Sequence, residues 1–243
     1  MKTYHLTLGA LVVSLLASCA GTHIEPKADA LLAAMSSKLK DAHSLRISGT
    51  RKMDASLVQG MKAMESVTFN LAMTRPNKVN AVMKGADGSR RLIENGQNVT
   101  LVDMEPNFYS TVSAPGKSVN QIADSLKKSF GFNPPLAEFL GDDPRKELLE
   151  GVTSSKLLGT KMVNGTNCEG LAFTQPGMEW QIWIGTGDSL PHRIEIVYTD
   201  RAGHPKYEAN ITKWELGAQV SDSEFIYTPS KGARKIDMIP VPN

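Results

Sequence analysis

The spacing of apolar side chains changes twice along the chain, and each change marks a new kind of element. In residues 26–43 apolar side chains recur every three or four positions, which places them along one side of a helix. Pro26 suits the first turn of that helix, where the backbone N–H that it lacks has no partner in any case. The sequence therefore predicts a front helix with one apolar side, formed by Leu31, Leu32, Met35 and Leu39.

From Leu45 onward the period becomes two, which is typical of an antiparallel strand with one buried face. The clearest run alternates apolar residues with polar or small ones, at Val67, Phe69, Leu71 and Met73. Turns interrupt the runs at 75–77, 85–88 and 94–97, and the last of these contains Asn-Gly, a strong hairpin signal. We expect this half to be one sheet of consecutive neighbours.

A helical pattern returns between Ser118 and Gly151. Ser118 can cap a first helix that ends at Gly131, and Asp143-Pro144 can open another that runs through Leu149. Residues 136–140 lie between them, after a break at two prolines. We expect this insert to lie against an apolar surface, because it is rich in Phe130, Phe132, Leu136, Phe139 and Leu140.

Strands resume at Thr153 and continue nearly to the end of the chain. Asn164-Gly165 predicts a hairpin between 155–163 and 166–174, and a final strand is expected at 224–227. The total is about eleven strands in a single domain over 26–243, an α+β fold that is mainly β. We expect an open, strongly curved antiparallel sheet, a half-barrel, with a front helix and a helical lid insert.

The start of the chain has the features of a bacterial lipoprotein signal. Lys2 precedes an apolar stretch at 6–16, too short for a bilayer span of ~20 residues but suited to a signal peptide. Leu16-Ala17-Ser18-Cys19 then matches a lipobox. We expect residues 1–18 to be a signal peptide, Cys19 to carry acyl chains such as palmitate, and 19–25 to be a tether. The alternative is an ordinary signal peptide with an incidental cysteine.

Composition narrows the classes of function. The chain has 27 Lys and Arg against 25 Asp and Glu and no basic stripe, which argues against a nucleic-acid partner. His23, His43, His192 and His204 lie far apart, without metal-ligand spacing. Catalytic motifs are absent, so we expect no enzyme activity, no cofactor and no metal. Cys168 is expected to be a buried small hydrophobe.

Several residues have two interpretations. Trp180, Ile182 and Ile184 share one face of a strand, with Trp183 on the other, and they either line a pocket or fill a core. Arg75 either faces water in a turn or anchors a lid through hydrogen bonds to its carbonyl groups. The abundant methionines suit adaptable apolar binding or loose packing, and they include Met53, Met61, Met64, Met73, Met83 and Met104.

The order of these elements resembles the LolA/LolB-like superfamily of lipoprotein carriers. The similarity covers residues 74–79, the hairpin at 94–101 and the closing segment 225–233. A family of predicted periplasmic proteins of uncharacterised function is more similar still, at 109–112, 151–154 and 180–184. The resemblance implies a curved sheet around a hydrophobic cavity, closed by helices, in which members of known role hold acyl chains or other apolar groups.

These observations predict a membrane-anchored lipoprotein on the periplasmic side of the envelope. Ala20 after the cysteine favours the outer membrane under the enterobacterial sorting rule. We expect a lipid, an acyl chain or another apolar ligand in the half-barrel, with Arg75 anchoring the lid. The alternative is an envelope sensor or scaffold that binds a protein partner. The expected ligand-binding residues are Val67, Phe69, Leu71, Met73, Met83, Phe130, Leu136, Phe139, Trp180, Ile182 and Trp214.

Overall fold

The computed structural model describes residues 22–57, 65–86, 88–114, 116–130 and 136–240. Its helices are α1 (Pro26–Lys40), α2 (Val119–Phe130), α3 (Ala137–Leu140) and α4 (Pro144–Leu149). Its strands are β1 (Ser44–Met53), β2 (Glu65–Thr74), β3 (Lys78–Gly85), β4 (Gly88–Asn95), β5 (Asn98–Asp103), β6 (Phe108–Ser113), β7 (Ser154–Val163), β8 (Thr166–Gln175), β9 (Met178–Gly185), β10 (Pro191–Val197), β11 (Lys206–Leu216) and β12 (Arg234–Lys235). Two short 3₁₀ turns, η1 (Ala55–Leu57) and η2 (Asp222–Phe225), complete the described elements.

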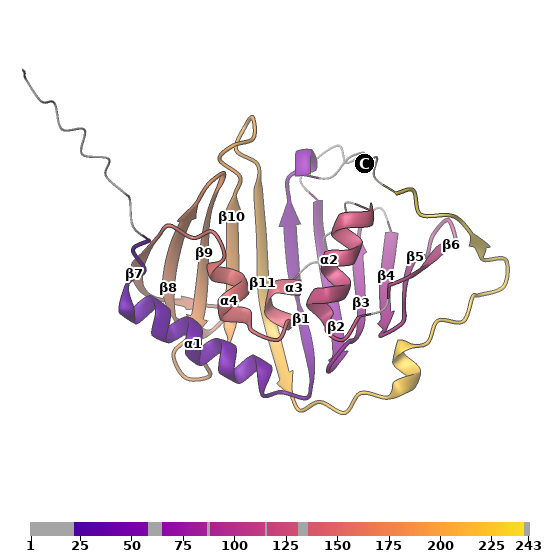
Figure 1. The fold of residues 1–243 in the computed structure, drawn as a ribbon, viewed down its shortest axis with the longest axis horizontal. Coiled ribbons are helices and arrows are strands. Elements are labelled where there is room, and N and C mark those ends of the chain that lie inside the picture. The colour runs from indigo at the N-terminus through magenta and orange to yellow at the C-terminus, as the bar shows by residue number, and fades with distance from the viewer. Residues whose placement is uncertain (1–21, 58–64, 87, 115, 131–135, 241–243) are drawn as a thin grey trace, which may run out of the picture.

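All twelve strands belong to one sheet, in the order β12-β6-β5-β4-β3-β2-β1-β11-β10-β9-β8-β7. Two meanders, β1–β6 and β7–β11, join where β1 pairs with β11, so that Ile47 lies opposite Trp214. The sheet is open and curved, and the helices all cover one of its faces (Figure 1). We call this covered face the inner face and its opposite the outer face. The expected fold class is confirmed.

Local signals place most of these elements correctly. Asn164 and Gly165 have φ angles of 49° and 83°, the left-handed pair that a tight hairpin turn between β7 and β8 requires. The Asp143 side chain accepts a hydrogen bond from the Lys146 backbone N–H at the start of α4. The front helix ends three residues earlier than expected, at Lys40, with Asp41 as its cap.

The end of the chain differs from the prediction of a final strand at 224–227. Residues Asp222–Phe225 form the 3₁₀ turn η2 instead. There the Ser221 hydroxyl accepts from the Ser223 N–H, and the Glu224 carboxylate accepts from the Ser221 N–H, so the polar side chains compete with strand pairing. The chain then reaches β12, which pairs in parallel with β6 and makes the sheet mixed rather than wholly antiparallel.

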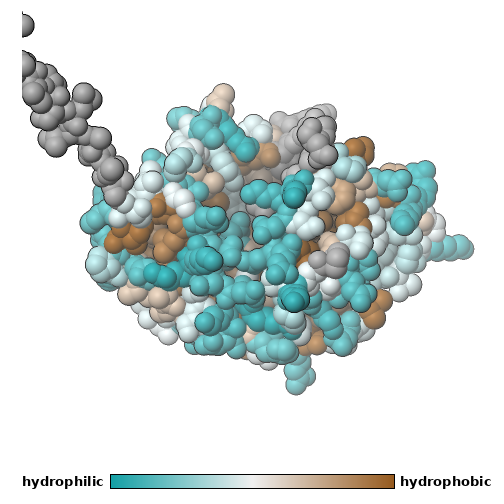
Figure 2. Space-filling view, in the orientation of Figure 1, coloured by the Kyte–Doolittle hydropathy of each residue, from teal (hydrophilic) through white to brown (hydrophobic). Residues whose placement is uncertain are grey.

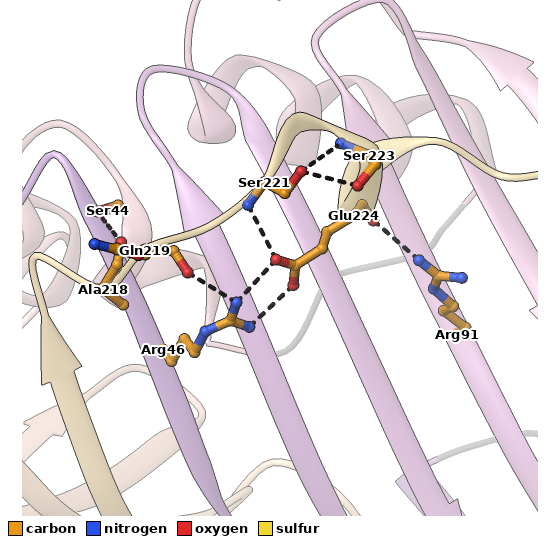
Figure 3. Close-up of polar contacts among 8 residues, drawn as sticks. All are labelled: Ser44, Arg46, Arg91, Ala218, Gln219, Ser221, Ser223 and Glu224. Atoms are coloured by element: carbon orange, nitrogen blue, oxygen red, sulfur yellow. Dashed lines mark hydrogen bonds and ion pairs between the residues drawn. The ribbon is translucent and has the colours of Figure 1, made fainter.

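Residues 217–235 form a strap that crosses the outer face of the first meander. Arg46 binds the Glu224 carboxylate through two hydrogen bonds of 3.0 and 2.9 Å, and Arg91 donates to the Glu224 carbonyl oxygen at 2.9 Å (Figure 3). Phe225 is 1% exposed, and η2 lies against β3 and β4. The strap therefore buries apolar side chains on the face that the helices leave uncovered.

Candidate functional site

The helices cover the inner face with their apolar sides. The buried side chains of α1 and α2 include Leu32, Met35, Leu39, Val119, Ile122 and Leu126. They meet inward-facing strand residues in one core that includes Ile47, Phe69, Leu71, Met73, Phe173, Ile182 and Ile211. Figure 2 shows mainly hydrophilic residues over the middle of this side of the molecule, where α3 and α4 lie. The helices thus turn their polar sides to solvent.

An apolar pocket lies between strands β2–β4 and the helices α2 and α3. We call it the lid pocket, and we call α2 with α3 the lid. Its lining consists of Leu71, Val79, Ala81, Met83, Leu92, Glu94, Val119, Ala137 and Leu140. Its volume is about 20 Å³, which holds about one water molecule. The expected unfilled interior is not found at this pocket, because side chains of the lid itself, such as Ile122 and Phe139, are buried in the core.

Glu94 is the acidic residue of the lid pocket. It follows Leu92 on the inner face of β4, lies opposite Val79 of β3, and is 5% exposed. Desolvation by burial raises the pKa of its carboxyl to about 8. Among the described residues, no group makes a hydrogen bond to this carboxyl. Glu94 is therefore a neutral acid at pH 7, in apolar surroundings that disfavour its charge.

Arg75 joins the lid to the front helix. From the turn between β2 and β3, its guanidinium donates to the carbonyl oxygens of Leu39 (3.2 Å) and Ala42 (3.2 Å) at the end of α1. It also donates to those of Leu140 (3.0 Å) and Gly141 (3.1 Å) at the end of α3. Burial lowers the pKa of Arg75, and Asp142 opposes that effect. One cation thus satisfies carbonyl groups that a helix end leaves without a partner.

A larger hollow lies on the outer face of β7–β10, and we call it the outer groove. Its volume is about 310 Å³. Most of its lining faces away from the helices, because Lys156, Ala172, Gln181 and Glu195 are cross-strand neighbours on that face. The full lining is Ser154, Ser155, Lys156, Ala172, Phe173, Thr174, Glu179, Trp180, Gln181, Glu195 and Val197.

The residues expected to bind a ligand occupy three kinds of position. Leu71 and Met83 line the lid pocket. Trp180 stacks on Phe173, with ring centroids 4.1 Å apart, and also borders the outer groove, while the half-buried Trp214 donates its indole N–H to the Pro191 carbonyl oxygen. The others are buried in the core or half-buried against it: Val67, Phe69, Met73, Phe130, Leu136, Phe139 and Ile182. Cys19 lies outside the described residues.

The sequence interpretation missed Glu94, because residues 94–97 were assigned to a turn. The two-residue spacing of Leu92 and Glu94 is the one signal that places Glu94 on the inner face of a strand. That signal is weak, because Ile93 between them is apolar as well. Both Leu92 and Ile93 are buried, on opposite faces of the sheet. A strand that is apolar on both sides does not tell which side carries the site.

Other candidate chemistry is sparse in the part of the chain that the structure describes. No group of three or more His, Cys, Asp and Glu side chains there is arranged to hold a metal ion. Cys168 is fully buried beside Val163 and Trp183, as expected of a core thiol, and burial raises its pKa to about 11. None of the described helices is long and apolar enough to cross a bilayer.

Comparison with known proteins decides the family. The model of the DUF2092 family, described as predicted periplasmic proteins, matches residues 28–239. The chain belongs to the DUF2092 family. No curated protein sequence matches this DUF2092 protein.

Two solved structures share the fold of the DUF2092 protein. An uncharacterized conserved protein from Thermus thermophilus is 10% identical, with 87% of this chain and 99% of that chain covered and a TM-score of 0.52. LprF from Mycobacterium bovis is 14% identical, with 83% and 97% covered and a TM-score of 0.51. At these identities the matches show a common architecture.

Proposed function

We propose that this DUF2092 protein binds an apolar ligand, a lipid or an acyl chain, between its sheet and its lid in the periplasm. The lid pocket carries the proposal, because eight of its nine lining residues are apolar and two helices of the insert close it. The LolA/LolB-like resemblance agrees with this interpretation. The protein acts by binding rather than by catalysis.

The small volume of the pocket is compatible with a larger ligand if the lid moves. With the lid closed, lid side chains such as Val119 and Leu140 pack against the apolar surface of the strands. A ligand that displaces the lid replaces one apolar contact with another, and burial contributes about 25 cal/mol per Å² in both states. Ligand binding is therefore favoured as soon as the ligand buries more apolar area than the displaced lid did.

Two matched substitutions, each replacing an alanine by leucine, test where the ligand binds. Ala81 lines the lid pocket and Ala172 lines the outer groove, and both are half-buried strand residues. We expect Ala81→Leu to weaken binding of a fluorescent fatty acid by about tenfold or more, because the added side chain blocks the pocket; such a loss equals ~1.4 kcal/mol. Ala172→Leu is expected to leave it unchanged, and circular dichroism checks that both variants fold. No binding by the wild type, or sensitivity to Ala172→Leu alone, contradicts the proposal.

Anchoring through an acylated Cys19 completes the proposal. The backbone of His23 pairs with the edge of β7, through hydrogen bonds of 2.8 Å to the Thr153 carbonyl and 3.0 Å from the Ser155 N–H. Four residue steps from Cys19 to His23 span at most ~14 Å, so the β7 edge would lie close to the bilayer. The absence of aspartate after the cysteine favours the outer membrane.

Detergent phase partition measures the anchor directly. We expect the mature wild-type protein to enter the detergent phase and Cys19→Ser to stay in the aqueous phase, because two or more acyl chains bind a membrane stably. Mass spectrometry of the N-terminal peptide should show the acyl mass on the cysteine. A wild-type protein that partitions like Cys19→Ser would contradict the anchor.

The outer groove favours a second candidate, an envelope sensor or scaffold that binds a protein partner. Its lining includes Lys156, Glu179 and Glu195, which suit a polar peptide better than an acyl chain. A partner recovered with the wild type and lost in Ala172→Leu, together with an empty lid pocket, would favour this function.

A further inference from the structure

Glu94 occupies a position that packing alone does not explain. Its side chain lies on the wall of the lid pocket, between Val79 of β3 and Val99 of β5, and Val119 of α2 lines the same pocket. Only 5% of the residue is exposed. Within the described residues its carboxyl has no hydrogen-bond partner, although buried carboxyl groups in proteins normally have one. An apolar side chain would fill this place at lower free energy.

The surroundings of this carboxyl limit what it can bind. The other eight lining residues are apolar, so the lining supplies no cation to balance an anionic group. The neutral Glu94 carboxyl can donate one hydrogen bond to a carboxylate or phosphate head, but that anion would lie in a region of low dielectric with no cation to balance its charge. An ammonium head instead stabilises the ionised form of Glu94, which then supplies the opposite charge. A carboxyl group accepts hydrogen bonds well from ammonium and hydroxyl donors, and a charged pair is the stronger of the two.

We infer that the ligand of the lid pocket carries a hydrogen-bond donor, an amine or a hydroxyl, next to its apolar chain, and that Glu94 binds this donor. The inference rests on the proposed function and names the ligand class. The apolar chain lies along Ala81, Met83 and Leu71, which continue the lining away from Glu94. Glu94 thus selects the head group, and the strands accept the chain.

Four probes with the same twelve-carbon chain separate the possible head groups: dodecylamine, dodecanol, dodecanoate and dodecyltrimethylammonium. The last carries a positive charge without an N–H donor. Displacement of a fluorescent fatty acid from the full mature protein at pH 7, below the micelle concentration of each probe, gives the affinities. We expect dodecylamine to bind at least about tenfold more tightly than dodecanoate or dodecyltrimethylammonium, as a charge-assisted hydrogen bond predicts, with dodecanol in between.

Glu94→Leu and Glu94→Gln supply the decisive comparison. Glu94→Leu keeps the pocket apolar, and we expect it to reduce the preference for dodecylamine to within about twofold, chiefly because dodecylamine binds more weakly. Glu94→Gln keeps an acceptor without a charge and should retain part of the preference. A wild type that does not distinguish the probes, or a preference that survives in Glu94→Leu, overturns the inference and leaves the proposed function standing. Failure of the wild type to bind any of the chains overturns both.

Discussion

Replacing Glu94 by leucine is expected to stabilise the protein, and the gain should grow as the pH rises from about 4.5 to about 8. The carboxyl has an ordinary pKa of 4.5, and burial raises it to about 8 in the folded protein. Between these values the unfolded chain releases a proton that the folded protein keeps, so the free energy of unfolding falls with rising pH. Each pH unit in this interval changes it by about 1.4 kcal/mol.

The expected gain for Glu94→Leu at pH 7 is on the order of 3 kcal/mol. Urea unfolding of the wild type and the variant at several pH values between 4.5 and 8.5 measures it, and the difference between the two proteins removes the contribution of other titrating groups. Glu179→Gln, which changes an exposed glutamate of β9, is the matched control and should follow the wild-type profile. A difference between wild type and Glu94→Leu that stays constant across this range would show that folding does not raise the pKa of Glu94.

Replacing Arg75 by leucine is expected to destabilise the protein by about 3 kcal/mol, because hydrogen bonds to a charged donor contribute about 1.5–3 kcal/mol and are not additive. The four carbonyl oxygens that Arg75 binds belong to the ends of α1 and α3. Its loss should also release the lid, so that amide hydrogens of α3 exchange faster than those of the sheet. Chemical unfolding and native-state hydrogen exchange measure the two effects.

Arg90→Leu is the control for Arg75, because Arg90 is an exposed arginine of β4 whose contact with Asp103 is 3.4 Å long. Its loss is expected to change stability by less than about 0.5 kcal/mol. Arg75→Lys keeps the charge, but three ammonium donors cannot satisfy four carbonyl groups, so it should restore only part of the stability. Equal behaviour of Arg75→Leu and Arg90→Leu would mean that Arg75 does not hold the lid.

Local chemistry made many of the elements predictable. The Asn164-Gly165 turn has the left-handed backbone that its residue types favour, and the α4 cap at Asp143 forms between residues three positions apart. The three- and four-residue spacing in the front helix and the alternation in β2 depend only on near neighbours. Such spacing predicts the element correctly in any fold that buries one side of it, whatever the rest of the chain does.

The strap and the site could not be predicted in the same way. The sequence predicts a strand at 224–227, but residues Asp222–Phe225 form a 3₁₀ turn, and Arg46, 178 positions from Glu224 in the sequence, binds Glu224 and helps to hold that turn. Because the strap crosses the outer face at β3 and β4, Ile93 is as buried as Leu92, and the alternation that would assign Glu94 to the inner face is hidden. Which groups are desolvated depends on segments that meet only after folding.

The amino-acid sequence by itself determined most of the helices, the hairpins and the mainly β class, since each depends on residues close together in the chain. Tertiary structure alone decided that the lid pocket is closed down to about 20 Å³, that Arg75 joins two helix ends, and that Glu94 is buried without a partner among the described residues. The physical reason is that burial and hydrogen-bond partners are set by distant segments packing together, whereas turns and helix periods are set locally.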